Sequence, residues 1–139
     1  MSRVQLALNV SNIEQAVEFY GKLFGTEPAK RKPGYANFAV AEPALKLVLI
    51  ENAEKAGTLN HLGVEVETAA EVKVASDRLR QTGLVPHQED KVDCCYALQD
   101  KAWVVDPDGA PWEIYTVLEH IEKPTPEVRN PASACAKCS

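Results

Sequence analysis

Several features that would indicate common functions are missing from the sequence. No run of about eighteen apolar residues occurs, and residues 1–10 carry one basic residue and no long apolar stretch, so neither membrane insertion nor secretion is indicated. Asp and Glu outnumber Lys and Arg by 20 to 15, and no basic run is present, which disfavours nucleic acid as a partner. A glycine-rich phosphate loop and a Gly-x-Ser-x-Gly motif are both absent, which disfavours nucleotide use and serine hydrolysis.

The size and composition are those of one globular domain. The chain has 139 residues, of which 45% are hydrophobic and 25% charged. We expect a cytoplasmic protein, a monomer or a homodimer, whose four cysteines are reduced ligands or reactive thiols rather than disulfides. Prolines and small residues dominate after residue 118, so residues 119–139 are expected to form a flexible, Cys-containing tail.

The first half of the chain predicts a strand followed by a helix. Alternating apolar residues over 4–10 indicate a half-buried strand. Apolar residues at helical spacing over 13–24 indicate a helix, with Ser11 or Asn12 as its cap and Gly25 at its end.

The same order returns about halfway along the chain. Apolar residues alternate over 62–66, Thr68 is a helix cap, and a second helical pattern ends at Gly83. Placing position 5 on position 61 aligns the two patterns, so the chain contains an internal duplication.

Short strand candidates follow each helix. They lie at 35–40 and 45–50 in the first copy and at 84–87, 94–98, 102–105 and 112–117 in the second. The predicted fold is therefore α+β, with two tandem βαβββ modules over about 1–57 and 58–118. Two curved sheets would then enclose a cleft that can hold a metal.

Three polar residues of this pattern are candidate metal ligands. Gln5 and His61 begin equivalent strands on the face opposite to the apolar residues, and Glu113 lies between apolar neighbours, where a carboxylate must be paired or coordinated. Taken singly, Gln5 is also compatible with a surface residue and His61 with a hydrogen bond at a strand edge. Three ligands would leave metal positions open, because Lys46 rather than a carboxylate occupies the last strand of the first copy.

Two adjacent cysteines, Cys94 and Cys95, suit a soft, thiophilic guest, although buried cysteines also serve as small hydrophobes. Neighbouring strand residues point to opposite faces, so a shared guest requires irregular backbone, and we predict a loop or bulge that spans 90–95. Cys135 and Cys138 are either part of a solvated tail or a thiol pair that delivers the guest. Weaker candidates for the pocket lining are Tyr35, Asn37, Phe38, Tyr96, Lys101, Trp103 and Tyr115, whereas His87 and His120 are not expected to be ligands.

Two stretches resemble the vicinal oxygen chelate superfamily, which includes glyoxalase I, extradiol dioxygenases and fosfomycin-resistance proteins. They are the helix over 12–25 and the Asp-Pro-Asp-Gly turn at 106–109 with the following Trp-Glu. Within the superfamily, the segments 32–38, 93–97 and 99–101 are most similar to the arsenical carbon-arsenic lyases and to the cadmium-induced proteins.

The resemblance implies an iron(II)-dependent enzyme that uses dioxygen to cleave the carbon-arsenic bond of trivalent organoarsenicals, methyl or aromatic, and releases arsenite. It assigns Gln5, His61 and Glu113 to the metal, and Cys94 and Cys95 to catalysis and to arsenic binding, with Tyr96 and Lys101 beside the substrate. Because Gln5 stands where the non-haem iron triad has a histidine, zinc, manganese and nickel stay open as alternatives.

Two other functions remain open from the sequence. The four thiols would suit a cytosolic cadmium- or arsenic-binding resistance protein without catalysis. A metalloenzyme of the glyoxalase or fosfomycin-resistance type would use the same metal ligands but would not need the cysteine pair.

Overall fold

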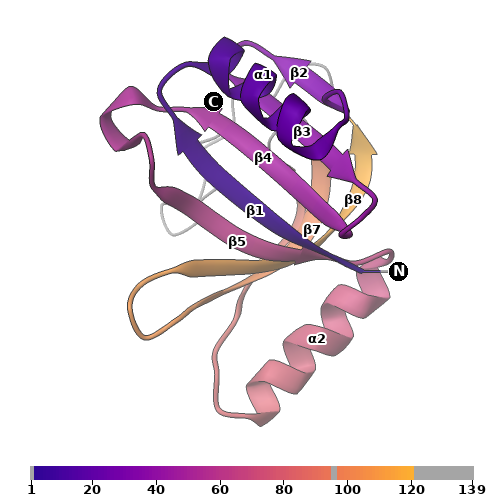
Figure 1. Cartoon of the computed structure of the whole chain (residues 1–139). Coiled ribbons are helices and arrows are strands. Elements are labelled where there is room, and N and C mark those ends of the chain that lie inside the picture. Colours follow the sequence, from indigo (N-terminus) through magenta and orange to yellow (C-terminus); the bar gives the residue numbers. More distant parts are fainter. Residues whose placement is uncertain (1, 95–96, 121–139) are drawn as a thin grey trace. The chain divides into compact units, whose positions relative to one another are not determined.

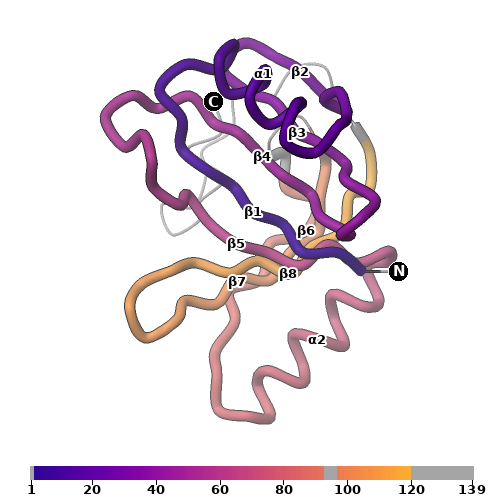
Figure 2. Tube along the Cα trace, in the orientation of Figure 1, coloured from indigo at the N-terminus to yellow at the C-terminus, as the bar shows by residue number. Residues whose placement is uncertain are grey.

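A computed structural model describes residues 2–94 and 97–120. Figures 1 and 2 follow the chain by colour through two compact units, Arg3–Leu62 and a second unit that begins at Gly63. The first contains β1 (Arg3–Val10), α1 (Ile13–Phe24), β2 (Lys30–Lys32), β3 (Tyr35–Val40), β4 (Leu45–Glu51) and a short 3-10 turn, η1 (Ala53–Lys55). Then follow β5 (Leu59–Glu65), which spans the boundary between the units, α2 (Ala69–Gln81), β6 (His87–Cys94), β7 (Ala97–Val105) and β8 (Pro111–His120).

The order of these elements confirms the α+β fold with two βαβββ modules. In the first unit the strand order is β2-β3-β4-β1, with β5 next to β1, and β1 runs parallel to β4. In the second unit β7 lies between β6 and β8 and pairs antiparallel with both. Neither helix among the described residues is long and apolar enough to cross a membrane.

Helix α1 packs on one face of the first unit's sheet (Figure 1). Its residue Ile13 joins a core of buried side chains from β3 and β4, and Leu6, Leu8 and Val10 of β1 pack against that core while remaining half-buried. The more buried residues of β1 are on its other face: Gln5 and Asn9 are each 4% exposed. The apolar alternation thus predicted the strand correctly, and the polar face of the strand is buried as well.

Both predicted helix starts are confirmed. Asn12 caps α1 by accepting a hydrogen bond from the Gln15 backbone at 2.9 Å, and Gly25 ends that helix in the left-handed conformation. Thr68 caps α2 in a reciprocal arrangement with Glu71.

Three strand predictions need correction. Residues 84–86 are not in a strand, because β6 begins only at His87. The candidate 94–98 is not one strand, because Cys94 ends β6 and β7 begins at Ala97; β7 then continues through the candidate 102–105 and pairs with β8 across the polar residues between them. The basic strand β2 lacked apolar alternation and was missed.

Candidate functional site

Gln5 and His61, which occupy equivalent positions in the duplication, are in contact in the first unit. Gln5 lies on β1 and His61 on β5, and the Gln5 Nε2 atom is 3.0 Å from His61 Nε2. Both side chains are almost fully buried, at 4% and 2% exposure. Buried polar groups need hydrogen-bond partners, and this contact provides one for each of the two side chains.

The 3.0 Å separation of this pair is an ordinary hydrogen-bond distance between the Gln5 amide nitrogen and the imidazole. The amide nitrogen is not a metal donor, so Gln5 would act as a ligand only with its amide rotated to bring the oxygen toward His61 Nε2. An imidazole nitrogen and an amide oxygen are both accepted by iron, zinc, manganese and nickel. Lys46 lies beside Gln5 in the β1–β4 register and provides no such donor.

The second nitrogen of His61 also has a partner. His61 Nδ1 lies 2.7 Å from the side-chain oxygen of Asn60. In metal sites the ligating histidine normally donates its other ring N–H to an oxygen in this way, which fixes the orientation of the ring.

Glu113 belongs to the second unit, where it pairs with Lys101. Its Oε1 atom lies 2.8 Å from the Lys101 ammonium, and both side chains are at most 3% exposed. The ammonium also lies 5.4 Å from the ring centre of Trp103 and 5.7 Å from that of Tyr115. Glu113 thus has the buried, charge-compensated environment that the sequence required, and Lys101 is a partner of this carboxylate.

The β7–β8 register explains why these four side chains share one face. Lys101 is opposite Tyr115 and Trp103 is opposite Glu113, so the lysine and the glutamate are diagonal neighbours on the same side of the pair. Trp103 Nε1 further donates to Glu89 Oε1 at 2.9 Å. The aromatic candidates of the first unit are also interior: Phe38 is a core residue, and Asn37 donates to the hydroxyl of Tyr35 at 3.0 Å.

A bulge precedes the cysteine pair. The β6–β7 register shifts between Glu89 and Val92, and Lys91 adopts a positive φ of 52°. The Asp100 carboxylate accepts a hydrogen bond from the Lys91 backbone at 2.7 Å and so holds the bulge in place. The predicted irregularity is confirmed at 90–91 and is wrong for 92–94, where regular pairing with β7 resumes.

Of the predicted thiol site, the structure describes only the backbone of Cys94, the last residue of β6. Cys95, Tyr96, Cys135 and Cys138 lie outside the described residues. Within the described part of the chain, no three His, Cys, Asp or Glu side chains group around a common point, so a metal there would depend on the amide of Gln5.

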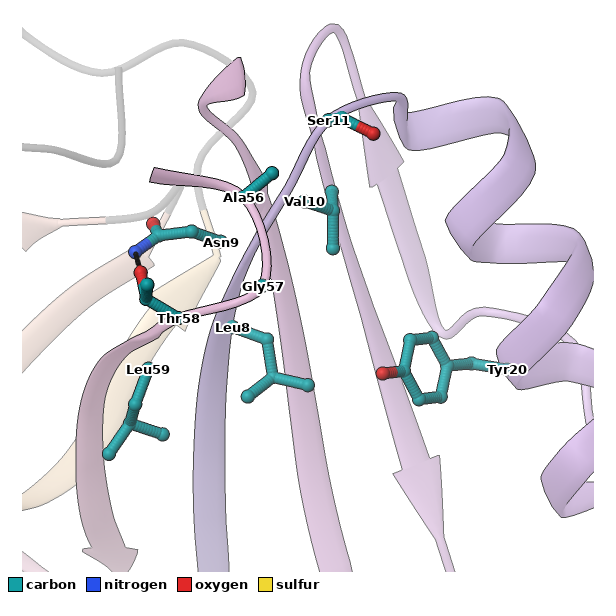
Figure 3. Close-up of a pocket in the computed structure, with 9 residues that line it drawn as sticks. All are labelled: Leu8, Asn9, Val10, Ser11, Tyr20, Ala56, Gly57, Thr58 and Leu59. Carbon is teal, nitrogen blue, oxygen red and sulfur yellow. Dashed lines mark hydrogen bonds between the residues drawn. The ribbon is translucent and has the colours of Figure 1, made fainter. Parts of the chain in front are cut away.

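A cavity of about 360 Å³ lies in the first unit between β1, α1 and the segment 56–59 (Figure 3). Its lining includes Asn9, Thr58 and Tyr20, and none of the described metal-ligand or substrate candidates. Asn9 and Thr58 were missed from the sequence. An asparagine at a buried position of an otherwise apolar strand, on the same face as Gln5, was the available signal.

The fold and the buried polar residues define a two-module α+β protein with metal-competent side chains. The chain belongs to the Glyoxalase/Bleomycin resistance protein/Dioxygenase superfamily, whose pattern matches residues 3–114. It is 61% identical over 118 residues to the trivalent organoarsenical cleaving enzyme of Thermomonospora curvata, covering 84% of this chain and 78% of that protein. It is 59% identical over 122 residues to the cadmium-induced protein CadI of Mycobacterium tuberculosis, covering 88% of this chain and 80% of that protein.

The likeness to solved structures is one of fold. The Mn(II)-bound glyoxalase from Novosphingobium aromaticivorans superposes with a TM-score of 0.59 at 17% identity, covering 90% of this chain and 43% of the other. The predicted superfamily, and the resemblance to the arsenical and cadmium-induced proteins within it, are confirmed.

Proposed function

We propose that this protein is an iron(II)-dependent, dioxygen-using enzyme that cleaves the carbon-arsenic bond of trivalent organoarsenicals and yields arsenite. The observation that carries the proposal is the buried Gln5–His61 pair, in which an imidazole and a side-chain amide that can supply nitrogen and oxygen ligands lie in direct contact. The 61% identity to a trivalent organoarsenical cleaving enzyme supports the choice of substrate.

In this proposal Gln5, His61 and Glu113 hold the metal. A bound iron(II) ion would supply a site at which dioxygen is bound and reduced. The Lys101 ammonium lies 2.8 Å from the Glu113 carboxylate and compensates its charge in this buried position. The low exposure of all four side chains keeps bulk water away from them.

The substrate is held by the two adjacent thiols. A trivalent organoarsenical with two hydroxyls condenses with Cys94 and Cys95, forming two arsenic-sulfur bonds and releasing two molecules of water. Arsenic capture by soft sulfur and metal capture by nitrogen and oxygen are then separate, and the reaction between the two becomes intramolecular.

The test is anaerobic reconstitution of the metal-free protein with iron(II), addition of a trivalent methyl or phenyl arsenical, and admission of air while arsenite is measured. We expect arsenite only when iron, thiols and air are all present. Parallel samples loaded with manganese or zinc distinguish iron from the other metals. Absence of arsenite from fully reconstituted protein, under conditions where it binds both iron and the arsenical, would contradict the proposal.

A second function has support of its own, because the 59% identity to a cadmium-induced protein is nearly as high. A protein that only binds cadmium or arsenite through its cysteines would protect cells without Gln5, His61 and Glu113. If the protein is the enzyme proposed above, His61→Ala abolishes protection against the organoarsenical. Full protection by His61→Ala would favour the binding function.

A further inference from the structure

A chain of side-chain hydrogen bonds joins the exposed Thr58 to the buried His61. The Asn9 amide donates to the Thr58 hydroxyl at 2.9 Å, and the Asn60 amide donates to Asn9 Oδ1 at 3.0 Å. Asn60 Oδ1 in turn lies 2.7 Å from His61 Nδ1. All four residues belong to the first unit.

The direction of this chain is set at its exposed end. The Thr58 hydroxyl donates its single proton to the main-chain carbonyl of Lys55, which can only accept. The hydroxyl must therefore accept from Asn9, and this makes Asn9 Oδ1 the acceptor for Asn60. Because the Asn60 amide nitrogen donates to Asn9, Asn60 presents its side-chain carbonyl oxygen to His61. His61 Nδ1 is therefore the donor in this contact.

The backbone holds the exposed end of the chain in place. The Asn9 N–H donates to the Thr58 carbonyl at 2.9 Å, and the Gly57 N–H donates to the Asn9 carbonyl at 3.0 Å. Gly57 has a φ of 84°, which a residue with a side chain rarely adopts. Figure 3 shows the Asn9 and Thr58 side chains pointing toward one another across this turn.

We propose that Asn60, Asn9 and Thr58 are positioning residues that hold His61 as the neutral tautomer with its proton on Nδ1. The Nε2 lone pair then faces Gln5, whose amide nitrogen is 3.0 Å away and can donate to it while no metal is bound. The opposite tautomer would place the Nδ1 lone pair against the Asn60 carbonyl oxygen in a partly buried contact, a mismatch that rotation of the Gln5 amide does not relieve. The tautomer is independent of the proposed function, and only its use in metal binding rests on that function.

The tautomer can be read directly from the metal-free protein. Long-range ¹H–¹⁵N spectra at about pH 8, where imidazoles are normally neutral, distinguish a protonated ring nitrogen from an unprotonated one. The chain has three histidines, so His87→Gln and His120→Gln identify the signals of the other two. We expect His61 Nδ1 to be protonated and Nε2 unprotonated. A proton on Nε2 in the wild-type protein would overturn the proposal.

Variants test the direction of the chain. Asn60→Leu removes the acceptor and should give a mixture of tautomers, whereas Asn60→Asp keeps an acceptor toward His61 and should keep the proton on Nδ1, although it can no longer donate to Asn9. Thr58→Val removes the hydroxyl at an exposed position and should also give a mixture, which Thr58→Ser should restore. Thr82→Val is the matched control, because Thr82 donates to the Leu79 carbonyl at 2.7 Å without leading to His61. A wild-type tautomer in both Asn60→Leu and Thr58→Val would contradict the proposal.

Metal affinity separates this inference from the proposed function. Asn60→Leu should weaken manganese or iron(II) binding by about 10- to 100-fold in competition with a chelator, as is usual when the partner of a ligating histidine is lost. Unchanged affinity in Asn60→Leu together with an altered tautomer would disprove the role of the tautomer in metal binding. Wild-type affinity in His61→Ala would instead disprove the metal assignment in the proposed function and leave the tautomer result intact.

Discussion

Gln5 is the residue in which the proposed ligand set departs from imidazole and carboxylate. Its amide lies at 3.0 Å from His61 Nε2 and can present either its nitrogen or its oxygen there, depending on the rotation of the amide group. A neutral amide oxygen is a weaker donor than imidazole. The affinity for metal is thus expected to rise when an imidazole replaces the amide at this position.

We predict that Gln5→Ala weakens metal binding by at least about 10-fold, because a donor atom is lost, whereas Gln5→His retains or strengthens it. Anaerobic titration of iron(II) against a chromophoric chelator measures both effects. Asn37→Ala is the control, since it removes another buried amide from the first unit's sheet without a contact to His61. Equal affinities of wild type and Gln5→Ala would exclude Gln5 as a ligand.

Lys101 shows how a buried charge is made tolerable by its neighbours. We predict that Lys101→Met destabilises the metal-free protein by about 3–5 kcal/mol, because Glu113 would be left buried without its counterion. The double variant Lys101→Met/Glu113→Leu should recover much of this loss. Urea unfolding measures all three proteins.

A surface pair provides the control for Lys101. Lys73 and Asp77 lie 3.1 Å apart on α2, but their side chains are 71% and 48% exposed. Lys73→Met should therefore change the free energy of unfolding by no more than about 0.5 kcal/mol. If Lys101→Met lowered the free energy of unfolding no more than Lys73→Met, the buried Lys101–Glu113 pair would not contribute to stability.

At the scale of elements, the bulge in β6 links a local hydrogen bond to the position of the thiols. Lys91 at a φ of 52° is held by Asp100, which precedes Lys101 on β7. Pairing resumes after the bulge and continues to Cys94, so the register of Cys94 depends on where the extra residue is accommodated.

We predict that Asp100→Ala destabilises the protein by about 1–3 kcal/mol and weakens arsenical binding, because the Lys91 N–H loses its charged acceptor. Asp100→Asn retains an acceptor oxygen and should be milder in both assays. Urea unfolding and titration with a phenyl arsenical measure the two effects. Arsenical affinity unaltered by Asp100→Ala would show that the bulge does not position the cysteines.

The sequence predicted a helix or strand correctly where a regular apolar pattern was bounded by a residue that caps or ends the element. The apolar stripe of α1 between Asn12 and Gly25 is such a case, and so is the alternation in β1. Strand β2 could not be predicted, because Lys30–Lys32 is entirely basic and its strand character comes only from pairing with β3. The long β7 was divided in two because the buried Lys101 interrupts its apolar pattern.

The candidate site was predictable to the extent that its residues break a local rule. Gln5 and Glu113 stand out as polar residues in apolar strands, and both are buried. The duplication then coupled Gln5 to His61. Asn60 and Thr58 gave no such signal, because polar residues at the start of a strand are ordinary, and their role emerges only from the hydrogen bonds that join them to Asn9.

For the molecule as a whole, the two compact units contain different parts of the proposed machinery. The first contains the Gln5–His61 pair and the polar chain behind it, and the second contains the Lys101–Glu113 pair and the bulge before Cys94. Arsenic binding and metal binding should therefore respond to separate substitutions. The segment from Pro124 to Ser139, with Cys135 and Cys138, is a third part that the proposal treats as auxiliary.

The last prediction tests this division of labour. Trivalent arsenic exchanges hydroxyls for thiolates, whereas nitrogen and oxygen atoms hold the iron, so Cys94→Ser and Cys95→Ser should each abolish tight arsenical binding and leave iron affinity nearly unchanged. Truncation after Lys123 should still give a folded protein that converts saturating substrate, with a defect only at low arsenical concentration. Titration of arsenical and of iron against wild type, both serine variants and the truncation measures each part. Tight arsenical binding by both serine variants would remove Cys94 and Cys95 from the mechanism, and complete loss of binding on truncation would move the arsenic site to Cys135 and Cys138.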